Sequence, residues 1–172
     1  MDAIAEEEAA LGRYAAERMA ELAAVSPLRM WPDVIDRIGV ATFTVAGFHH
    51  GLVAAALSAE HGVAARDGCF CAHPLMLRLL NVDPVNAARI RDEVAAGDHR
   101  NVPGAVRLST GIATTTADLD LAFDAVADIA IHGPRWTYRA DDGGAHYRPD
   151  PDDRPWPALA ALARTTEIAV TR

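Results

Sequence analysis

The sequence predicts a small sheet with helices packed on it, in an α+β or α/β layer arrangement. Three observations support this class. The chain has 172 residues, 51% of them hydrophobic, which is enough for one water-soluble domain with a hydrophobic core. Apolar residues recur at helical spacing in several segments. Short stretches of β-branched residues lie between those segments, which predicts the order helix, strand, helix, strand, helix, helix, strand, helix, followed by a tail.

The N-terminal part predicts one long helix and one strand. The helix is expected over 2–25 and to be ended by Pro27. Its inward face is expected to comprise Ile4, Leu11, Ala15, Met19 and Leu22. The β-branched residues of 37–46, RIGVATFTVA, predict a strand. Both of its faces are fairly apolar, so we expect it to be central in its sheet.

The next segments predict a helix, a short strand and a turn. The helix is expected over 49–60, where His49 and His50 favour a capping role at its start, and its inward side chains are Leu52, Val53, Ala56 and Leu57. A short strand is expected over 63–66. The sequence RDGCFCAHP, residues 66–74, begins with turn residues and has no periodicity.

Proline and aspartate define the elements that follow. Pro74 suits the first position of a short helix over 75–80, and Asp83-Pro84 suits the start of another that runs to about residue 96. A loop over 97–104 and a strand over 105–109 complete this stretch.

A capping pair predicts the last strong helix. Thr115 with Asp118 is expected to cap a helix over 116–131, whose inner stripe is Leu119, Phe123, Val126 and Ala130. Residues 136–149 resemble a hairpin with an Asp-Asp-Gly-Gly turn, and a weaker terminal helix is expected over 157–167.

Charge and composition exclude some partners. The formal net charge of −8 disfavours nucleic acid and anionic membrane surfaces. No apolar stretch approaches the roughly 20 residues of a membrane span, and the acidic N-terminus does not resemble a secretory signal. The sequence leaves open whether Met1 is the native start. Cys69 and Cys71 are too close in sequence to link distant parts of a fold, which favours a reduced, cytoplasmic setting.

Residues 40–80 carry a family signal. They contain a strand and a helix followed by Arg66, Gly68, Cys71, Ala72 and Pro74. This pattern resembles the small, C-terminal domain of cysteine desulfurases and selenocysteine lyases, which are pyridoxal-phosphate (PLP) enzymes of aminotransferase class V and fold type I. Typical desulfurases have a histidine pair where this chain has Cys69-Phe70, and the Gly-Cys-Phe-Cys string also looks like the loop of molybdenum-cofactor sulfurases.

A second motif occurs in the expected order. Residues 104–130 are similar to the closing strand and helix of that domain, in which an Arg-x-Ser strand supplies an arginine for the substrate carboxylate. The matching residues are Arg107 and Ser109. The resemblance implies an α+β fold with a small, mainly antiparallel sheet covered by helices. It also divides the chain into a class V C-terminal-like domain over 1–131 and a tail over 132–172.

The resemblance implies roles for five residues. Cys71 would be the catalytic residue, whose thiolate attacks the sulfur of a PLP-bound cysteine and becomes a persulfide. Arg107 and Arg66 would bind substrate, and Arg66 and His73 could supply positive charge to the thiolate. Cys69 is a possible redox or supporting residue. Cys69, Cys71 and His73 lack a second spaced pair of zinc ligands, so no metal site is predicted.

The basic residues limit what the chain can do alone. All 16 are arginine, so no lysine can hold PLP as a Schiff base. We therefore expect PLP in the complete enzyme and none bound by this chain alone. The implied partner is a PLP-binding large domain or a homologous subunit, in a homodimer.

Two other functions remain open. The chain could be a non-catalytic binding or assembly module, with an unusually apolar surface where the large domain once lay. It could also be a carrier that receives persulfide sulfur on Cys71. Desulfurase, lyase, epimerase and transaminase reactions all share this small domain, so the reaction and substrate remain open.

Overall fold

The computed structural model describes residues 2–31, 34 and 38–155, which form an α+β fold on a four-stranded antiparallel sheet. The strands are β1 (Val25–Pro27), β2 (Val40–Val45), β3 (Arg66–Gly68) and β4 (Ala105–Ser109). Their order in the sheet is β1-β2-β4-β3. The predicted class is confirmed, and so is the central position of the strand expected over 37–46.

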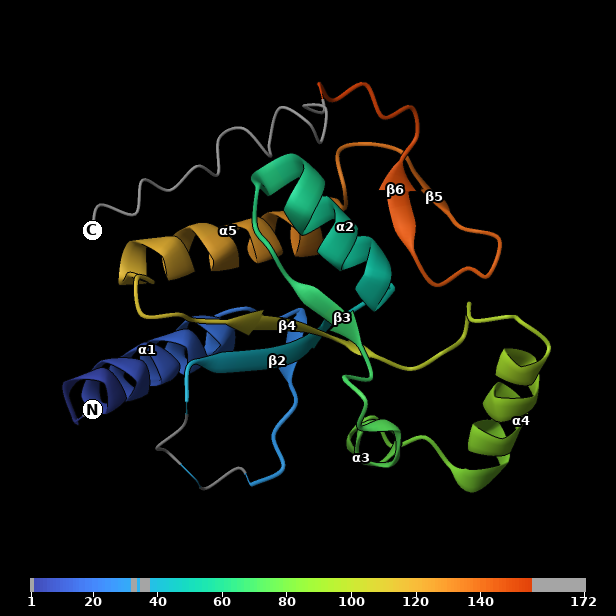
Figure 1. Cartoon of the computed structure of the whole chain (residues 1–172), viewed down its shortest axis with the longest axis horizontal. Helices are drawn as coiled ribbons and strands as arrows, with labels where there is room; N and C mark the ends of the chain where they lie inside the picture. Colours follow the sequence, from blue (N-terminus) through green and yellow to red (C-terminus); the bar gives the residue numbers. More distant parts are fainter. Residues whose placement is uncertain (1, 32–33, 35–37, 156–172) are drawn as a thin grey trace, which may run out of the picture.

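Helices cover one face of this sheet and extend beyond its end (Figure 1). The covering helices are α1 (Asp2–Ala20), α2 (His50–His61) and α5 (Thr116–His132). Two shorter helices, α3 (His73–Leu79) and α4 (Pro84–Ala95), form an arm at the end of the sheet. A hairpin of β5 (Tyr138–Ala140) and β6 (Tyr147–Pro149) lies beside α2.

Strand register separates an apolar face from a polar one. Phe43 of β2 lies opposite Val106 of β4, and both are completely buried under the helices with Phe123 of α5. Because successive residues of a strand point to opposite faces, the intervening positions point away from this core. Thr42 and Arg107, paired across β2 and β4, are two of them.

The N-terminal part differs from the prediction. The helix expected over 2–25 ends at Ala20, and residues 25–27 form β1, which the sequence analysis missed. That strand exists because it pairs with residues 43–45 of β2, a non-local contact that overrides the helical pattern. Ile4, expected to face inward, is 40% exposed because it lies in the first turn, ahead of the buried positions of α1.

The middle of the chain needs a smaller correction. The strand expected over 63–66 lies at 66–68, so the start of the predicted turn segment is a strand paired with β4. The helix expected over 75–80 begins at His73. Leu52, expected inward on α2, is only partly buried.

The C-terminal elements match the prediction where the structure describes them. Thr115 and Asp118 form the capping box of α5, and the hairpin expected within 136–149 is present. The helix expected over 157–167 lies outside the described residues. The division at residue 131 stays a prediction. Among the helices described, none combines the length and hydropathy required to cross a bilayer.

Candidate functional site

Two arginines lie side by side on the open face of the sheet. Arg107 of β4 pairs with Arg66 of β3 on one side and with Thr42 of β2 on the other. Like charges directly opposite on neighbouring strands destabilise a sheet. No carboxylate of the described residues forms an ion pair with either arginine. Two adjacent guanidinium groups without a counter-charge suit an anionic ligand such as a carboxylate.

Arg107 also touches the cysteine loop, residues 69–72. Its guanidinium carbon lies 5.0 Å from the centre of the Phe70 ring, a cation–π contact. Its Nε is buried and has no hydrogen-bond partner among the described residues. A buried donor without a partner costs free energy, so the fold itself gives no reason for this Nε to be buried here.

The cysteine loop has a strained backbone. Phe70 and Cys71 adopt left-handed conformations, with φ of 54° and 59°. The Ala72 N–H closes the turn by donating to the Cys69 carbonyl at 2.8 Å. Two successive non-glycine residues in this region are unfavourable, and such strain gathers at functional sites. The turn leaves the Cys71 side chain exposed.

The two free thiols have different surroundings. The Cys69 thiol is partly buried and donates to the carbonyl of Pro103 at 3.0 Å. Burial raises its pKa, which disfavours the reactive thiolate. Cys71 is exposed. The structure therefore favours Cys71 as the reactive thiol and Cys69 as a packing residue that anchors the loop.

A histidine–aspartate pair supports the other side of the loop. His50 Nδ1 lies 2.9 Å from a carboxylate oxygen of Asp67, and His50 Nε2 lies 3.2 Å from the carbonyl of Val102. The hydrogen bond from His50 is the largest factor that lowers the pKa of Asp67. Gly104 allows this packing, because a Cβ there would lie 2.5 Å from the His50 ring.

His49, the neighbour of His50, caps helix α2. Its Nδ1 accepts a hydrogen bond from the Gly51 N–H, which agrees with the capping role expected for this pair. Burial, with a smaller contribution from His50, lowers the pKa of His49. The two rings are 4.1 Å apart.

These groups surround one hollow of about 210 Å³, here called the cysteine hollow. It is lined by His50, Asp67, Gly68, Cys69, Phe70, Cys71, His73, His99, Val102, Ala145 and His146. It brings together the predicted Cys69, Cys71 and His73. It also contains Asp67 and His146, which were not predicted: Asp67 lies within the RDGCFCAHP segment but is not one of its matching residues, and His146 lies outside both motifs. Their proximity depends on strand pairing and hairpin docking.

The two arginines do not line this hollow. Arg66 and Arg107 lie on the open face of the sheet, and the described link to the hollow is Phe70, which touches Arg107 and lines the hollow itself. The candidate site therefore has two parts, a pair of cations and an exposed thiol, with Phe70 between them.

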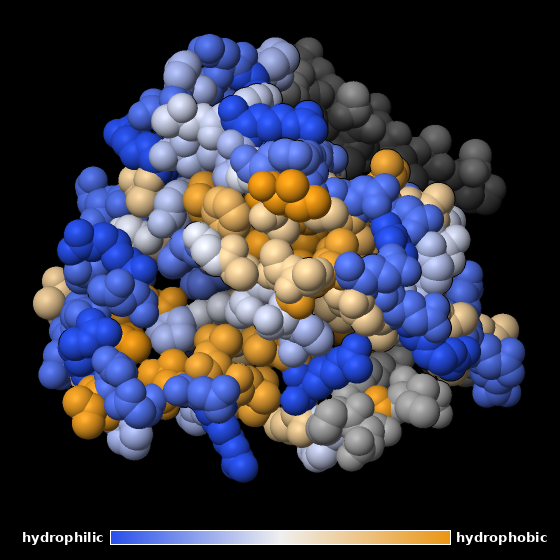
Figure 2. Space-filling view, turned by 180° about the vertical axis from the view of Figure 1, so that it is seen from behind, coloured by the Kyte–Doolittle hydropathy of each residue, from blue (hydrophilic) through white to orange (hydrophobic). Residues whose placement is uncertain are grey.

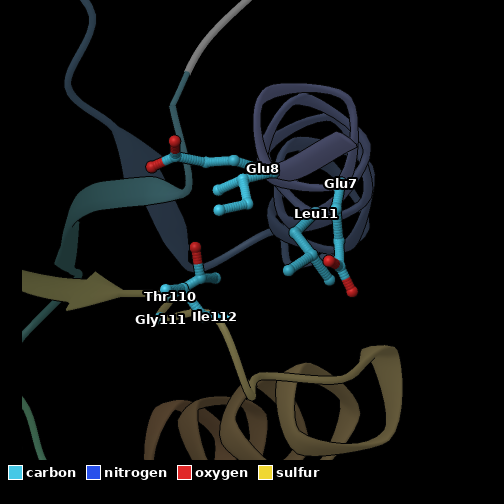
Figure 3. A pocket seen from close by; sticks show the side chains of 7 residues that line it. Glu7, Glu8, Leu11, Thr110, Gly111 and Ile112 are labelled. Carbon is cyan, nitrogen blue, oxygen red and sulfur yellow. The ribbon is translucent and has the colours of Figure 1, made fainter. Parts of the chain in front are cut away.

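Other hollows of the described part of the chain lack this combination of side chains. A hollow of similar size lies between α1 and the segment after β4 (Figure 3). Its lining includes Glu7 and Glu8 but no cysteine, histidine or arginine. In the part of the chain that the structure describes, no three His, Cys, Asp or Glu residues are grouped so that they could hold a metal ion.

An apolar groove of about 760 Å³ adjoins the cysteine hollow. It runs between α3 and α4 and is lined by apolar side chains that include Leu77, Ile90 and Val94. Apolar surface is visible on this side of the molecule, at the left of Figure 2. The groove shares Cys69, His73, His99 and Val102 with the hollow.

Comparison with known proteins identifies the family of the chain. The chain belongs to the aminotransferase class V family, whose family model matches residues 1–122. The expected family membership is therefore confirmed.

Individual relatives agree with this assignment. The chain is 46% identical over 77 residues to a cysteine desulfurase of Enterobacter sp. (strain 638), an alignment that covers 44% of this chain and 18% of the relative. It is similar in fold to the crystal structure of the cysteine desulfurase CsdA (S-sulfonic acid) of Escherichia coli. That match has a TM-score of 0.52 and 24% identity, and it covers 74% of this chain and 25% of that one. The chain thus spans a quarter or less of the proteins it matches.

Proposed function

We propose that this chain is the small domain of a cysteine desulfurase-like, PLP-dependent enzyme. Cys71 accepts the sulfur atom, and Arg107, with Arg66 beside it, binds the substrate carboxylate. A large domain, carried by another part of the protein or by a homologous subunit, completes the site. The observation that carries the proposal is the exposed Cys71, in a strained loop whose Phe70 packs on Arg107, which forms no ion pair with any described residue.

The residues of this chain do not provide a covalent site for PLP. The Schiff base of such enzymes needs a lysine amine, and the sequence has no lysine. The groups around the cysteine hollow are thiols, imidazoles and one carboxylate. The cofactor and its anchoring lysine therefore belong to the large domain.

The residues of this chain have two tasks in the reaction. The guanidinium of Arg107 matches a carboxylate in a bidentate geometry and so orients the amino acid. The Cys71 thiolate forms a bond to the sulfur of the substrate cysteine as the carbon–sulfur bond breaks, which leaves a persulfide on Cys71. The carbon takes up a proton, so cysteine becomes alanine and no external oxidant is needed.

Mass spectrometry of the chain after incubation with a sulfur donor tests the role of Cys71. We expect the Cys69→Ser variant to gain one sulfur atom, located on Cys71, and the Cys71→Ser variant to gain none at this loop. Cys69→Ser is the matched control because its hydroxyl can still donate to the Pro103 carbonyl. Sulfur found only on Cys69 would contradict the assignment.

The same experiment addresses the second function, a persulfide carrier. Persulfide on Cys71 is expected for both functions. Transfer of that sulfur from the isolated chain to an acceptor protein, with no large domain present, would favour the carrier. The exposed position of Cys71 is the observation that supports this alternative.

An assembly role is supported by a different surface. Several large apolar side chains are exposed in the segment that leads into β2, among them Met30, Trp31, Ile38 and Val40. Val40 lies on the open face of the sheet, where Ser109 is its partner on β4. Apolar surface of this kind suits contact with another domain or subunit.

A further inference from the structure

The β5–β6 hairpin reaches the cysteine hollow, although it lies beyond the part of the chain that matches the family. The match ends at residue 122, and the hairpin begins at Tyr138. Ala145 and His146, in the turn between the strands, line the hollow together with Cys71. The hairpin is therefore an additional wall of the candidate site.

Both ends of the hairpin are attached to the domain. At the base, the Glu60 carboxylate of α2 accepts hydrogen bonds from the N–H groups of Arg135 and Trp136 and from the Tyr138 hydroxyl, at 2.9, 3.2 and 2.9 Å. At the tip, the His99 N–H donates to the Gly143 carbonyl at 2.7 Å. The turn is thus held against the body of the domain from two sides.

Local sequence also fixes the turn that carries His146. The Asp141 carboxylate accepts from the N–H groups of Ala145 and His146, at 2.8 and 3.3 Å, and the Asp141 N–H donates to the His146 carbonyl at 2.8 Å. A Cβ on Gly51 would lie 2.8 Å from the Ala145 carbonyl oxygen. Glycine in the first turn of α2 therefore lets this turn lie directly on the helix.

The titratable groups that face the hollow come from every surrounding element. They are His50 of α2, Asp67 of β3, Cys69 and Cys71 of the loop, His73 of α3, His99 before β4, and His146 of the hairpin. Among these described residues Asp67 is the one carboxylate. His50, His146 and His49 all act to lower its pKa.

We propose that His146 is a supporting residue of the cysteine site, whose imidazolium favours the thiolate of Cys71. A cation beside a thiol stabilises its ionised form, and the thiolate is the nucleophile. The hairpin thus brings to the hollow an imidazole from beyond the residues that match the family. This inference rests on Cys71 being the reactive thiol of the proposed function.

Alkylation of Cys71 by iodoacetamide tests the proposal. The Cys69→Ser background leaves one thiol in the chain, and a neutral reagent avoids attraction or repulsion by the histidines. The rate is followed by mass spectrometry from about pH 5 to about pH 9. We expect His146→Gln to slow alkylation about threefold at neutral pH and to raise the midpoint of the pH profile by about half a unit.

A rescue variant distinguishes the effect of a positive charge at position 146 from an effect on the structure. His146→Arg keeps a positive charge at this position and should restore the wild-type rate, which a purely structural role would not predict. His132→Ala removes an exposed histidine that pairs with Asp128 on α5, and it should leave the profile unchanged. Circular dichroism establishes that each variant is folded.

The outcomes distinguish this inference from the proposed function. An unchanged profile in His146→Gln, or an effect found only in His73→Ala, overturns the role of His146 even when Cys71 still accepts sulfur. A slower His146→Gln, rescued by His146→Arg, supports that role even when no persulfide forms on Cys71.

Discussion

At the scale of single residues, Arg107 has surroundings that cost stability, as the proposed binding role would require. Arg107 lies opposite Arg66 on the neighbouring strand, and its buried Nε has no partner among the described residues. Both features cost stability, and the contact with Phe70 offsets only part of that cost. A residue selected for the fold alone would be apolar here.

Arg107→Met tests this interpretation. Methionine keeps an unbranched chain on the Phe70 ring and removes the unpaired charge. We expect the free energy of unfolding, measured with urea, to stay the same or to rise by up to about 1 kcal/mol. In the completed enzyme the same variant should bind substrate more weakly. As a control, Arg89→Met breaks an exposed ion pair with Glu93 and should lower the free energy of unfolding by a few tenths of a kcal/mol. If Arg107→Met lowered the free energy of unfolding by more than about 1 kcal/mol, Arg107 would have a structural role.

At the scale of elements, the start of α5 shows local sequence determining structure. The Thr115 hydroxyl accepts from the Asp118 N–H at 3.3 Å, and the Asp118 carboxylate accepts from the Thr115 N–H at 2.8 Å. These hydrogen bonds satisfy backbone donors that the first helical turn would leave unpaired. The helix begins where the capping pair predicted.

We expect Thr115→Ala to lower the free energy of unfolding by about 1 kcal/mol at neutral pH. Hydrogen bonds from the Thr115 backbone and, second, from the Thr115 hydroxyl at 2.8 Å hold the pKa of Asp118 below its usual value, and Thr115→Ala removes the second of them. Because the pKa is lower in the folded state, this stabilisation is present above about pH 4 and is lost as the pH falls below it. The penalty of Thr115→Ala should therefore shrink in thermal unfolding at about pH 3. A penalty independent of pH would mean that the carboxylate does not contribute to the cap.

At the scale of the whole molecule, the chain is proposed to supply a thiol and a carboxylate-binding arginine to a desulfurase-like site. The family match shows the class V family, and the chain spans 18% of the desulfurase it matches in sequence. Another domain could pack on two surfaces. One is the set of exposed apolar residues before β2, and the other is the groove between α3 and α4. The chain is thus proposed to work as part of a larger assembly.

Titration of the chain with PLP, followed by visible circular dichroism, tests whether the chain can hold the cofactor without a large domain. Free PLP is achiral and gives no band, whereas PLP held in a protein pocket does. We expect no band, because the chain has no lysine to form a Schiff base. A saturable band would show that a lysine-free pocket holds the cofactor, and the proposed need for a large domain would then be withdrawn.

The sequence by itself determined the features that depend on neighbours along the chain. Helix α5 and its cap, the strand at 105–109 and the hairpin follow from residues within a few positions of one another. The motif around Cys71 and the Arg-x-Ser strand likewise identified the family and the residues proposed to act.

Only the tertiary structure decided which distant residues meet. Strand β1 forms because β2 is there to pair with it. Arg66 lies opposite Arg107 because of strand register, and Asp67 meets His50 because α2 packs on that end of the sheet. His146 joins the cysteine hollow because the hairpin docks on α2. These contacts join segments up to about a hundred residues apart, and they depend on packing free energy that no local pattern records.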